Sequence, residues 1–211
     1  MYYDRRAAEY EEIYHRDDPA RQREIAAIAA AMRNALDGRL VLEVACGTGY
    51  WTGMAAEVAR HVVAVDSSPA MLALAHEKGL PKEKVEFRQG DAYGLEPVEG
   101  IFNAGLANFW LSHVPKARLA EFLQGFHSKL EKGSTVFMAD NLYVHGLGGD
   151  LVNEPGSEDT FKERKLSDGS VHKVLKNYYE AGDLRSILQP LSSGLHIEMG
   201  ECFWWVRYQV A

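Results

Sequence analysis

The feature that most constrains this chain is a short apolar segment that runs into a glycine-containing turn. Residues 40–44 are apolar apart from Glu43, and Gly47 and Gly49 follow closely. Glycines at such a turn permit positive φ and let a ligand approach the backbone without a Cβ in the way. The turn leads into a helix expected at 49–59, whose first N–H groups can receive a carboxylate or phosphate. The segment therefore predicts a strand, turn and helix that hold a nucleotide-like ligand.

The same alternation of strand and helix continues to residue 140. We expect strands at 40–44, 61–65, 85–88, 101–107 and 135–139, and helices at 2–14, 19–36, 49–59, 69–79 and 115–132. Asp18 before Pro19 and Ser68 before Pro69 mark two helix starts, and Gly133 is expected to end the last helix. Four strand-to-helix steps of this kind predict a parallel sheet with helices on both faces.

The pattern changes after residue 140. Residues 141–160 are rich in Gly, Asn, Asp and Pro and are expected to form a loop. Residues 161–166 and 171–175 flank Ser167-Asp168-Gly169, which predicts a β-hairpin. A helix is expected at 180–188, and two antiparallel strands at 195–201 and 202–210 close the chain. The 211 residues are expected to form a single α/β domain.

The composition indicates which kinds of partner the protein is expected to lack and in which compartment it is expected. The chain has 23 basic and 30 acidic residues and a net charge of −7, which argues against a nucleic-acid partner. Cys46 and Cys202 supply neither a disulfide framework nor zinc-ligand spacing, so we expect no metal. No apolar run follows Met1, and no stretch approaches the roughly 18 to 20 apolar residues of a membrane span. A cytoplasmic protein without a membrane partner is the expectation.

Acidic residues stand at the ends of three successive expected strands. Glu43 lies in the first, Asp66 ends the second, and Asp91 follows the third. Asp66 can accept both hydroxyls of a ribose, although it can also cap the next helix. Asp91 can accept from an adenine amine while the N–H of Ala92 donates to the ring, although alone it would be read as a turn residue. Because open α/β sheets bind ligands at the carboxyl ends of their strands, we favour binding roles for both.

The segment after the fourth strand, residues 108–115, is expected to face the same crevice. His113 can act there as a general base, or it can merely pack ahead of the next helix; the sequence leaves both open. Tyr2, Tyr3, Tyr10 and Tyr14 form an aromatic set that is either core or a lid over a cationic ligand. The hairpin brings Arg164, Lys165, Lys176 and Tyr178 towards the strand ends, where most of their charges are expected to be solvated.

A dinucleotide-binding fingerprint would require a third glycine where this chain has Thr52, so the turn is a weak match to that motif. The segments together instead resemble the class I S-adenosylmethionine-dependent methyltransferases, in particular the small-molecule branch. Residues 42–49 resemble the first motif of that family, 65–71 the second and 89–92 the third. Residues 108–115 are similar to the segment after the fourth strand, and the closing hairpin resembles the reversed last strand. Ala45 departs from the usual first glycine.

The resemblance implies a Rossmann-like methyltransferase fold. This is a doubly wound, mostly parallel seven-stranded sheet with an antiparallel last strand and a β-hairpin insertion. Residues 1–38 would be an N-terminal helical lid, and 141–176 an insertion on the acceptor side. The implied contacts with S-adenosyl-L-methionine are Tyr14, Glu43, Ala45, Cys46, Gly47, Thr48, Gly49, Asp66, Ser67, Met71, Asp91, Ala92 and Asn108. The expected acceptor contacts are Tyr3, Trp110, His113, Asn141, Arg164 and Tyr178.

The expected reaction is methyl transfer to a small molecule, with O-methylation first and N-methylation second. Two other readings remain at this stage: an NAD(P)-binding reductase, and a protein that holds S-adenosylmethionine or its demethylated product without turnover. The reductase would need a sixth parallel strand and a Tyr-x-x-x-Lys or similar pair, and the sequence shows neither. The acceptor and the oligomeric state have no signature in the sequence.

Overall fold

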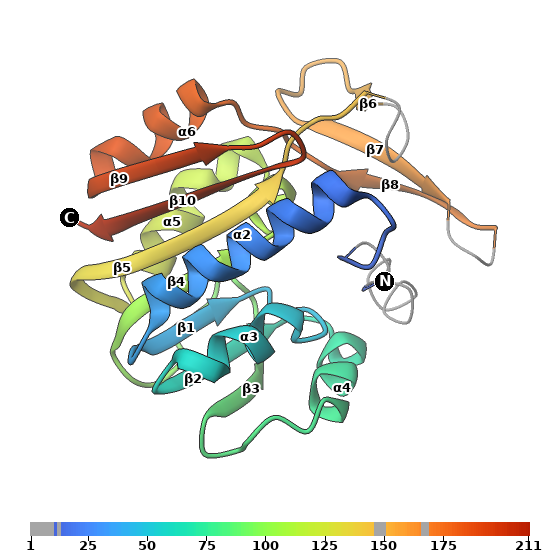
Figure 1. Ribbon diagram of the computed structural model, residues 1–211. Helices are drawn as coiled ribbons and strands as arrows, with labels where there is room; N and C mark the ends of the chain where they lie inside the picture. Colours follow the sequence, from blue (N-terminus) through green and yellow to red (C-terminus); the bar gives the residue numbers. More distant parts are fainter. Residues whose placement is uncertain (1–10, 12–13, 146–150, 166–168) are drawn as a thin grey trace.

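The computed structural model describes residues 11, 14–145, 151–165 and 169–211. Its main sheet consists of β1 (Leu40–Val44), β2 (His61–Asp66), β3 (Val85–Gln89), β4 (Phe102–Asn108), β5 (Leu130–Asn141), β9 (Ser192–Met199) and β10 (Phe203–Val210). The strand order is β3-β2-β1-β4-β5-β10-β9 (Figure 1). The first five strands are parallel, and β10 is antiparallel to both of its neighbours. The expected doubly wound fold with a reversed last strand is confirmed.

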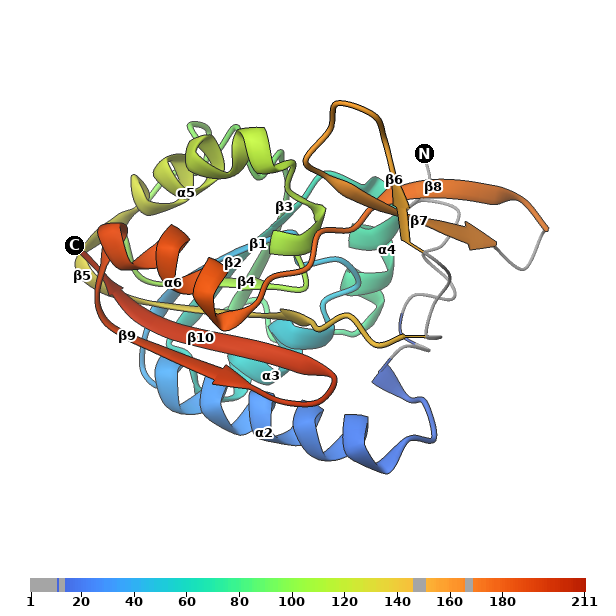
Figure 2. The ribbon, with the colours of Figure 1, turned by 90° about the horizontal axis from the view of Figure 1, so that it is seen from above.

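Helices cover both faces of this sheet, as expected (Figure 2). α2 (Pro19–Leu36) and α3 (Tyr50–Val58) pack on one face, and α5 (Leu119–His127) and α6 (Ala181–Leu188) pack on the other. α4 (Pro69–Glu77) lies beside β2 and β3. The side chains of Asp18 and Ser68 accept hydrogen bonds from the first turns of α2 and α4, which confirms both helix starts. In the described part of the chain, no helix is long and apolar enough to cross a membrane.

The helix predicted at 115–132 is shorter at both ends in the structure. Residues 116–118 form a 3-10 turn, α5 ends at His127, and Leu130 already belongs to β5, where it pairs with Phe102. Gly133, expected to end the helix, lies inside β5 with φ of +80°. The apolar spacing misled because Leu130 is buried in the same cluster as the apolar face of α5. When a strand begins on the same buried face as the preceding helix, its apolar residues continue the helical spacing, so the pattern alone does not show where the helix ends.

The insertion after β5 contains more structure than the sequence indicated. The segment expected to be a loop includes β6 (Leu151–Asn153), which pairs with β7 (Thr160–Lys165). β7 pairs in turn with β8 (Val171–Leu175), so the expected hairpin is confirmed and extended to a three-stranded antiparallel sheet. This small sheet lies beyond the end to which β1 and β5 point (Figure 1). The expected helix at 2–14 and Tyr3 fall outside the described residues, apart from Glu11 and Tyr14.

A glycine in β4 permits the close packing of α5 on the sheet. A Cβ at Gly105 would lie 2.7 Å from Cζ of Phe126 and 2.9 Å from Cδ1 of Leu130. We expect Gly105→Ala to lower the free energy of unfolding by about 1–3 kcal/mol, because these buried side chains must shift. Urea denaturation measures this change. Gly125→Ala is the matched control: this glycine lies on α5 with nothing within 4 Å of the added Cβ, and should be neutral or slightly stabilising. Equal losses in both variants would contradict the packing account.

Candidate functional site

The turn after β1 adopts the left-handed backbone that its glycines suggested. Gly47 and Gly49 have φ of +57° and +77°. A Cβ at Gly49 would lie 3.2 Å from both Ala75 Cβ and Phe87 Cζ, so both space and backbone favour glycine there. Ala45 also has positive φ, +52°, at the position where glycine was expected. The alanine is accommodated, but in a conformation that L residues rarely adopt.

Asp66 ties the end of β2 to this turn. One carboxylate oxygen accepts from the N–H of Gly47 at 2.8 Å, and the other accepts from the N–H of Ser68 at 2.9 Å. The side chain of Ser68, rather than that of Asp66, caps α4, by accepting from Met71 N at 3.2 Å. Each carboxylate oxygen has two lone pairs, so these backbone contacts orient Asp66 and leave acceptor capacity for a ligand hydroxyl.

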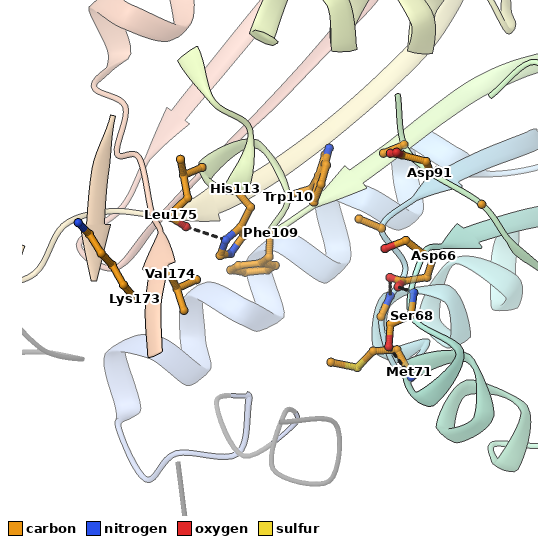
Figure 3. Close-up of a pocket in the computed structure, with 15 residues that line it drawn as sticks. Asp66, Ser68, Met71, Asp91, Phe109, Trp110, His113, Lys173, Val174 and Leu175 are labelled. Atoms are coloured by element: carbon orange, nitrogen blue, oxygen red, sulfur yellow. Dashed lines mark hydrogen bonds between the residues drawn. The ribbon is translucent and has the colours of Figure 1, made fainter. Parts of the chain in front are cut away.

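A cavity of about 420 Å³ opens at the carboxyl ends of the parallel strands. Figure 3 shows Asp66, Ser68, Met71 and Asp91 on one side, and His113, Val174 and Leu175 on the other. Both acidic residues expected to read ribose and adenine therefore face one space. The full lining is Ala45, Gly47, Asp66, Ser67, Ser68, Met71, Gly90, Asp91, Ala92, Phe109, Trp110, His113, Lys173, Val174 and Leu175.

Glu43 is the buried carboxyl group next to the turn. It is only 2% exposed, and its Oε2 atom has no hydrogen-bond partner among the described residues. Burial, reinforced by the negative charge of Asp66, raises the pKa of Glu43 to about 8. A buried acceptor without a donor is costly, and a ligand that brings an N–H group or a positive charge would relieve the cost.

The opposite wall of the cavity is built by residues 109–113 and the end of β8. His113 is part of a 3-10 turn at Leu111–His113, and its Nδ1 lies 2.9 Å from the carbonyl oxygen of Leu175 (Figure 3). A carbonyl only accepts, so Nδ1 carries the proton. The insertion sheet therefore contacts the residue that the sequence singled out as a possible base.

Nine residues predicted from the sequence line the cavity. Asn108 points its amide towards Met32, and Tyr14 stacks on Tyr50 with ring centroids 4.0 Å apart. Lys176, expected to be solvated, is instead only 6% exposed, because it is paired with buried Asp140. The contact roles of all the predicted residues stay predictions, and nine of the described ones do not line the cavity. These are Tyr14, Glu43, Cys46, Thr48, Gly49, Asn108, Asn141, Arg164 and Tyr178.

Several lining residues had no usable signal in the sequence. Lys173, Val174 and Leu175 reach the cavity only because the insertion sheet folds over the strand ends. Their place depends on tertiary packing, which local pattern does not encode. Phe109 belongs to the segment 108–115 that was expected to face the crevice, and its φ of +57° is unusual for a bulky residue. Ser68 and Gly90 lie beside predicted residues, so a wider reading of the second and third motifs would have included them.

The chain also matches known proteins. Residues 41–133 match the model of a family described as a methyltransferase domain. A cypemycin N-terminal methyltransferase from Streptomyces sp. is 32% identical over 119 residues, and a demethylmenaquinone methyltransferase from Renibacterium salmoninarum is 36% identical over 92 residues. The aligned parts cover 54% and 43% of this chain, and only 48% and 38% of those relatives. The solved structure of a DhpI-SAM-HEP complex has a TM-score of 0.78 at 28% identity, over 99% of this chain and 94% of that one.

The reversed last strand, the glycine turn after β1 and the acidic residues at the ends of β2 and β3 define a class of protein. The fold is that of the class I S-adenosylmethionine-dependent methyltransferases, and residues 41–133 match a methyltransferase domain. A DhpI structure in complex with SAH, with a TM-score of 0.76 at 29% identity, covers all of this chain and 94% of the other.

Proposed function

We propose that this protein transfers the methyl group of S-adenosylmethionine to a small molecule bound against the insertion sheet. The observation that carries the proposal is the single cavity lined by Gly47, Asp66 and Asp91 on one side and by His113 and Leu175 on the other. The cavity volume of about 420 Å³ is within the range of small-molecule sites, roughly 300–1,000 Å³. The matched methyltransferase family and the DhpI complexes with SAM and SAH support the cofactor assignment.

Each wall has a separate task in this proposal. Asp66 receives the ribose hydroxyls, Asp91 and Ala92 the adenine edge, and Glu43 the amino group of the methionine end. The sulfonium supplies an already activated methyl group, so the protein contributes mainly by alignment. Alignment of this kind is worth roughly 7–11 kcal/mol in good intramolecular models. The apolar side chains of Phe109, Trp110 and Val174 exclude water from the space where the acceptor lies.

The acceptor atom is proposed to be oxygen, with nitrogen as the alternative. His113 lies on the acceptor wall with its proton on Nδ1, so Nε2, which faces Lys176, is the ring atom that would take or guide a proton. A hydroxyl acceptor requires such a base more than an amine does. One relative is named as an N-terminal methyltransferase and the other as a demethylmenaquinone methyltransferase. These names do not select between an oxygen and a nitrogen acceptor.

We expect His113→Ala to lower turnover by about 100-fold or more and to leave S-adenosylhomocysteine affinity within about twofold. The side chain lies on the acceptor wall, away from Asp66 and Asp91 (Figure 3). Turnover is measured by methyl transfer and affinity by calorimetry. Wild-type turnover in this variant would reduce His113 to a packing role.

The experiment that tests the proposal is transfer of labelled methyl from S-adenosylmethionine to pooled small molecules from a cell extract. Label should enter a discrete small-molecule product, and mass spectrometry of that product identifies the methylated atom. The same incubation with Asp66→Ala is the control. Label that stays entirely in the cofactor with every pool, despite tight cofactor binding, would favour a protein that binds without turnover.

A further inference from the structure

A buried polar cluster lies directly behind the acceptor wall. Lys176 follows β8, Asp140 lies near the end of β5, and Ser112 precedes His113. The exposed fractions are 6% for Lys176, 0% for Asp140 and 1% for Ser112. Charged groups at this depth are retained only when they are paired and hydrogen-bonded, so the geometry of the cluster is expected to be fixed.

The ammonium group of Lys176 has three acceptors around it. Nζ lies 2.5 Å from Ser112 Oγ, 3.1 Å from Asp140 Oδ1 and 3.5 Å from His113 Nε2. Asp140 is held in turn, because its oxygens accept from the N–H and the hydroxyl of Ser112, each at 2.9 Å. Burial acts to raise the pKa of Asp140, but Lys176, His113 and the backbone N–H groups of Ser112 and Asn141 outweigh burial and lower it. Asp140 is therefore an anion that anchors Lys176.

The two ring nitrogens of His113 consequently have different surroundings. Nδ1 donates to the carbonyl of Leu175, and Nε2 faces the donor Lys176. A proton on Nε2 would point at an ammonium group and add a second positive charge beside it. We infer that Lys176, anchored by Asp140, is a positioning residue that keeps His113 as an uncharged imidazole with its proton on Nδ1 and its lone pair on Nε2.

Other charged groups near His113 have partners of their own, which limit their influence on the protonation of its ring. Lys173 on β8 lines the same cavity and is paired with Glu154. Asp159, before β7, accepts from the N–H of Lys116 and from the amide of Asn177. Asp66 and Asp91 stand on the opposite wall of the cavity (Figure 3). Lys176 and Asp140 are therefore the pair whose removal should change His113 most. The protonation state of His113 does not depend on the proposed function. Only its role as a base in methyl transfer rests on that proposal.

The test is the ¹⁵N NMR spectrum of the His113 ring in the unliganded full chain, followed across pH and assigned with His113→Gln. In the wild type we expect Nδ1 to carry the proton and Nε2 to be unprotonated at neutral pH. Lys176→Met should move the protonation midpoint of His113 upward by at least about one pH unit. Asp140→Asn should move it downward, because the ammonium then acts without its counter-charge. Lys176→Arg keeps the positive charge, and should stay near the wild-type midpoint.

Opposite shifts in the two charge variants support the inference, since a merely loosened structure would move both midpoints in the same direction. The inference is overturned by shifts of the same sign, by no shift, or by a proton on Nε2 in the wild type. If Lys176→Met does not fold, the wild-type tautomer and Asp140→Asn decide: a proton on Nε2, or an upward or absent shift in Asp140→Asn, overturns the inference. Should the NMR result hold while turnover is indifferent to His113→Ala, the base role under the proposed function fails and the positioning role of Lys176 stands.

Discussion

Asp66→Ala is expected to weaken the binding of S-adenosylhomocysteine at least tenfold, and up to about 100-fold. Loss of one or two charge-assisted hydrogen bonds to the ribose accounts for about 1.4–3 kcal/mol. The substitution has a second effect, because the same carboxylate accepts from the N–H groups of Gly47 and Ser68. Without the carboxylate, the turn after β1 loses the hydrogen bond that connects it to the end of β2. Isothermal titration calorimetry measures the change in affinity.

Two further variants make this result specific. Asp37→Ala removes an exposed carboxylate at the end of α2 and changes the net charge by the same amount, so its affinity should equal that of the wild type. Asp66→Asn keeps the shape of the side chain but loses its charge and one acceptor, so its affinity should fall between those of the wild type and Asp66→Ala. Unchanged affinity in Asp66→Ala would refute the ribose assignment.

Glu43 is expected to lower the stability of the unliganded protein as pH rises from about 4.5 to about 8, whereas buried His127, whose pKa is lowered to about 4, acts in the opposite direction below pH 6.5. Burial raises the pKa of this carboxyl from 4.5 to about 8, so the folded state holds a proton that the unfolded state releases. The stabilisation from this group is complete below pH 4.5 and is lost as pH rises through about 8. The loss amounts to up to about 4–5 kcal/mol, at 1.36 kcal/mol per pH unit.

Glu43→Gln removes this titration, so its unfolding free energy should fall less, or rise more, with pH than that of the wild type over the same range. Urea denaturation at a series of pH values gives the slope. Glu77→Gln, at the exposed end of α4, is the matched control and should keep the wild-type slope. Glu43→Gln should also weaken S-adenosylhomocysteine binding, since a neutral amide replaces the charge that would meet the amino group. An identical slope in the wild type and Glu43→Gln would show that Glu43 is not the titrating group.

Much of the fold is encoded locally, and the errors have identifiable causes. Asp18-Pro19 and Ser68-Pro69 combine a capping side chain with a proline of suitable φ, so both helices start where predicted. The end of α5 was misplaced because Leu130 continues the apolar spacing of the helix from within a strand. The short strand β6 was missed because three residues carry too little pattern, and its pairing with β7 depends on the tertiary fold.

The candidate site also has a part that the sequence predicts and a part that it does not. Gly47, Asp66 and Asp91 follow directly after strands of a parallel sheet, so their convergence was predictable from topology. The insertion was expected on the acceptor side, but which of its residues reach the cavity was not predictable, because the packing of Lys173, Val174 and Leu175 over the strand ends follows no sequence rule. Lys176 is the clearest case: a lysine in a polar stretch reads as solvated. Its burial follows from Asp140, a residue 36 positions earlier in the chain.

Thermal unfolding with added ligands tests the central claim most directly, which is that the cavity at the strand ends holds an adenosyl group attached to methionine. The midpoint is compared for the same unliganded protein with S-adenosylhomocysteine and with NAD. At 100 times its dissociation constant, S-adenosylhomocysteine should stabilise the fold by about 2.7 kcal/mol, and NAD should leave the midpoint unchanged. Stabilisation by NAD alone, or no response to S-adenosylhomocysteine, would contradict the account.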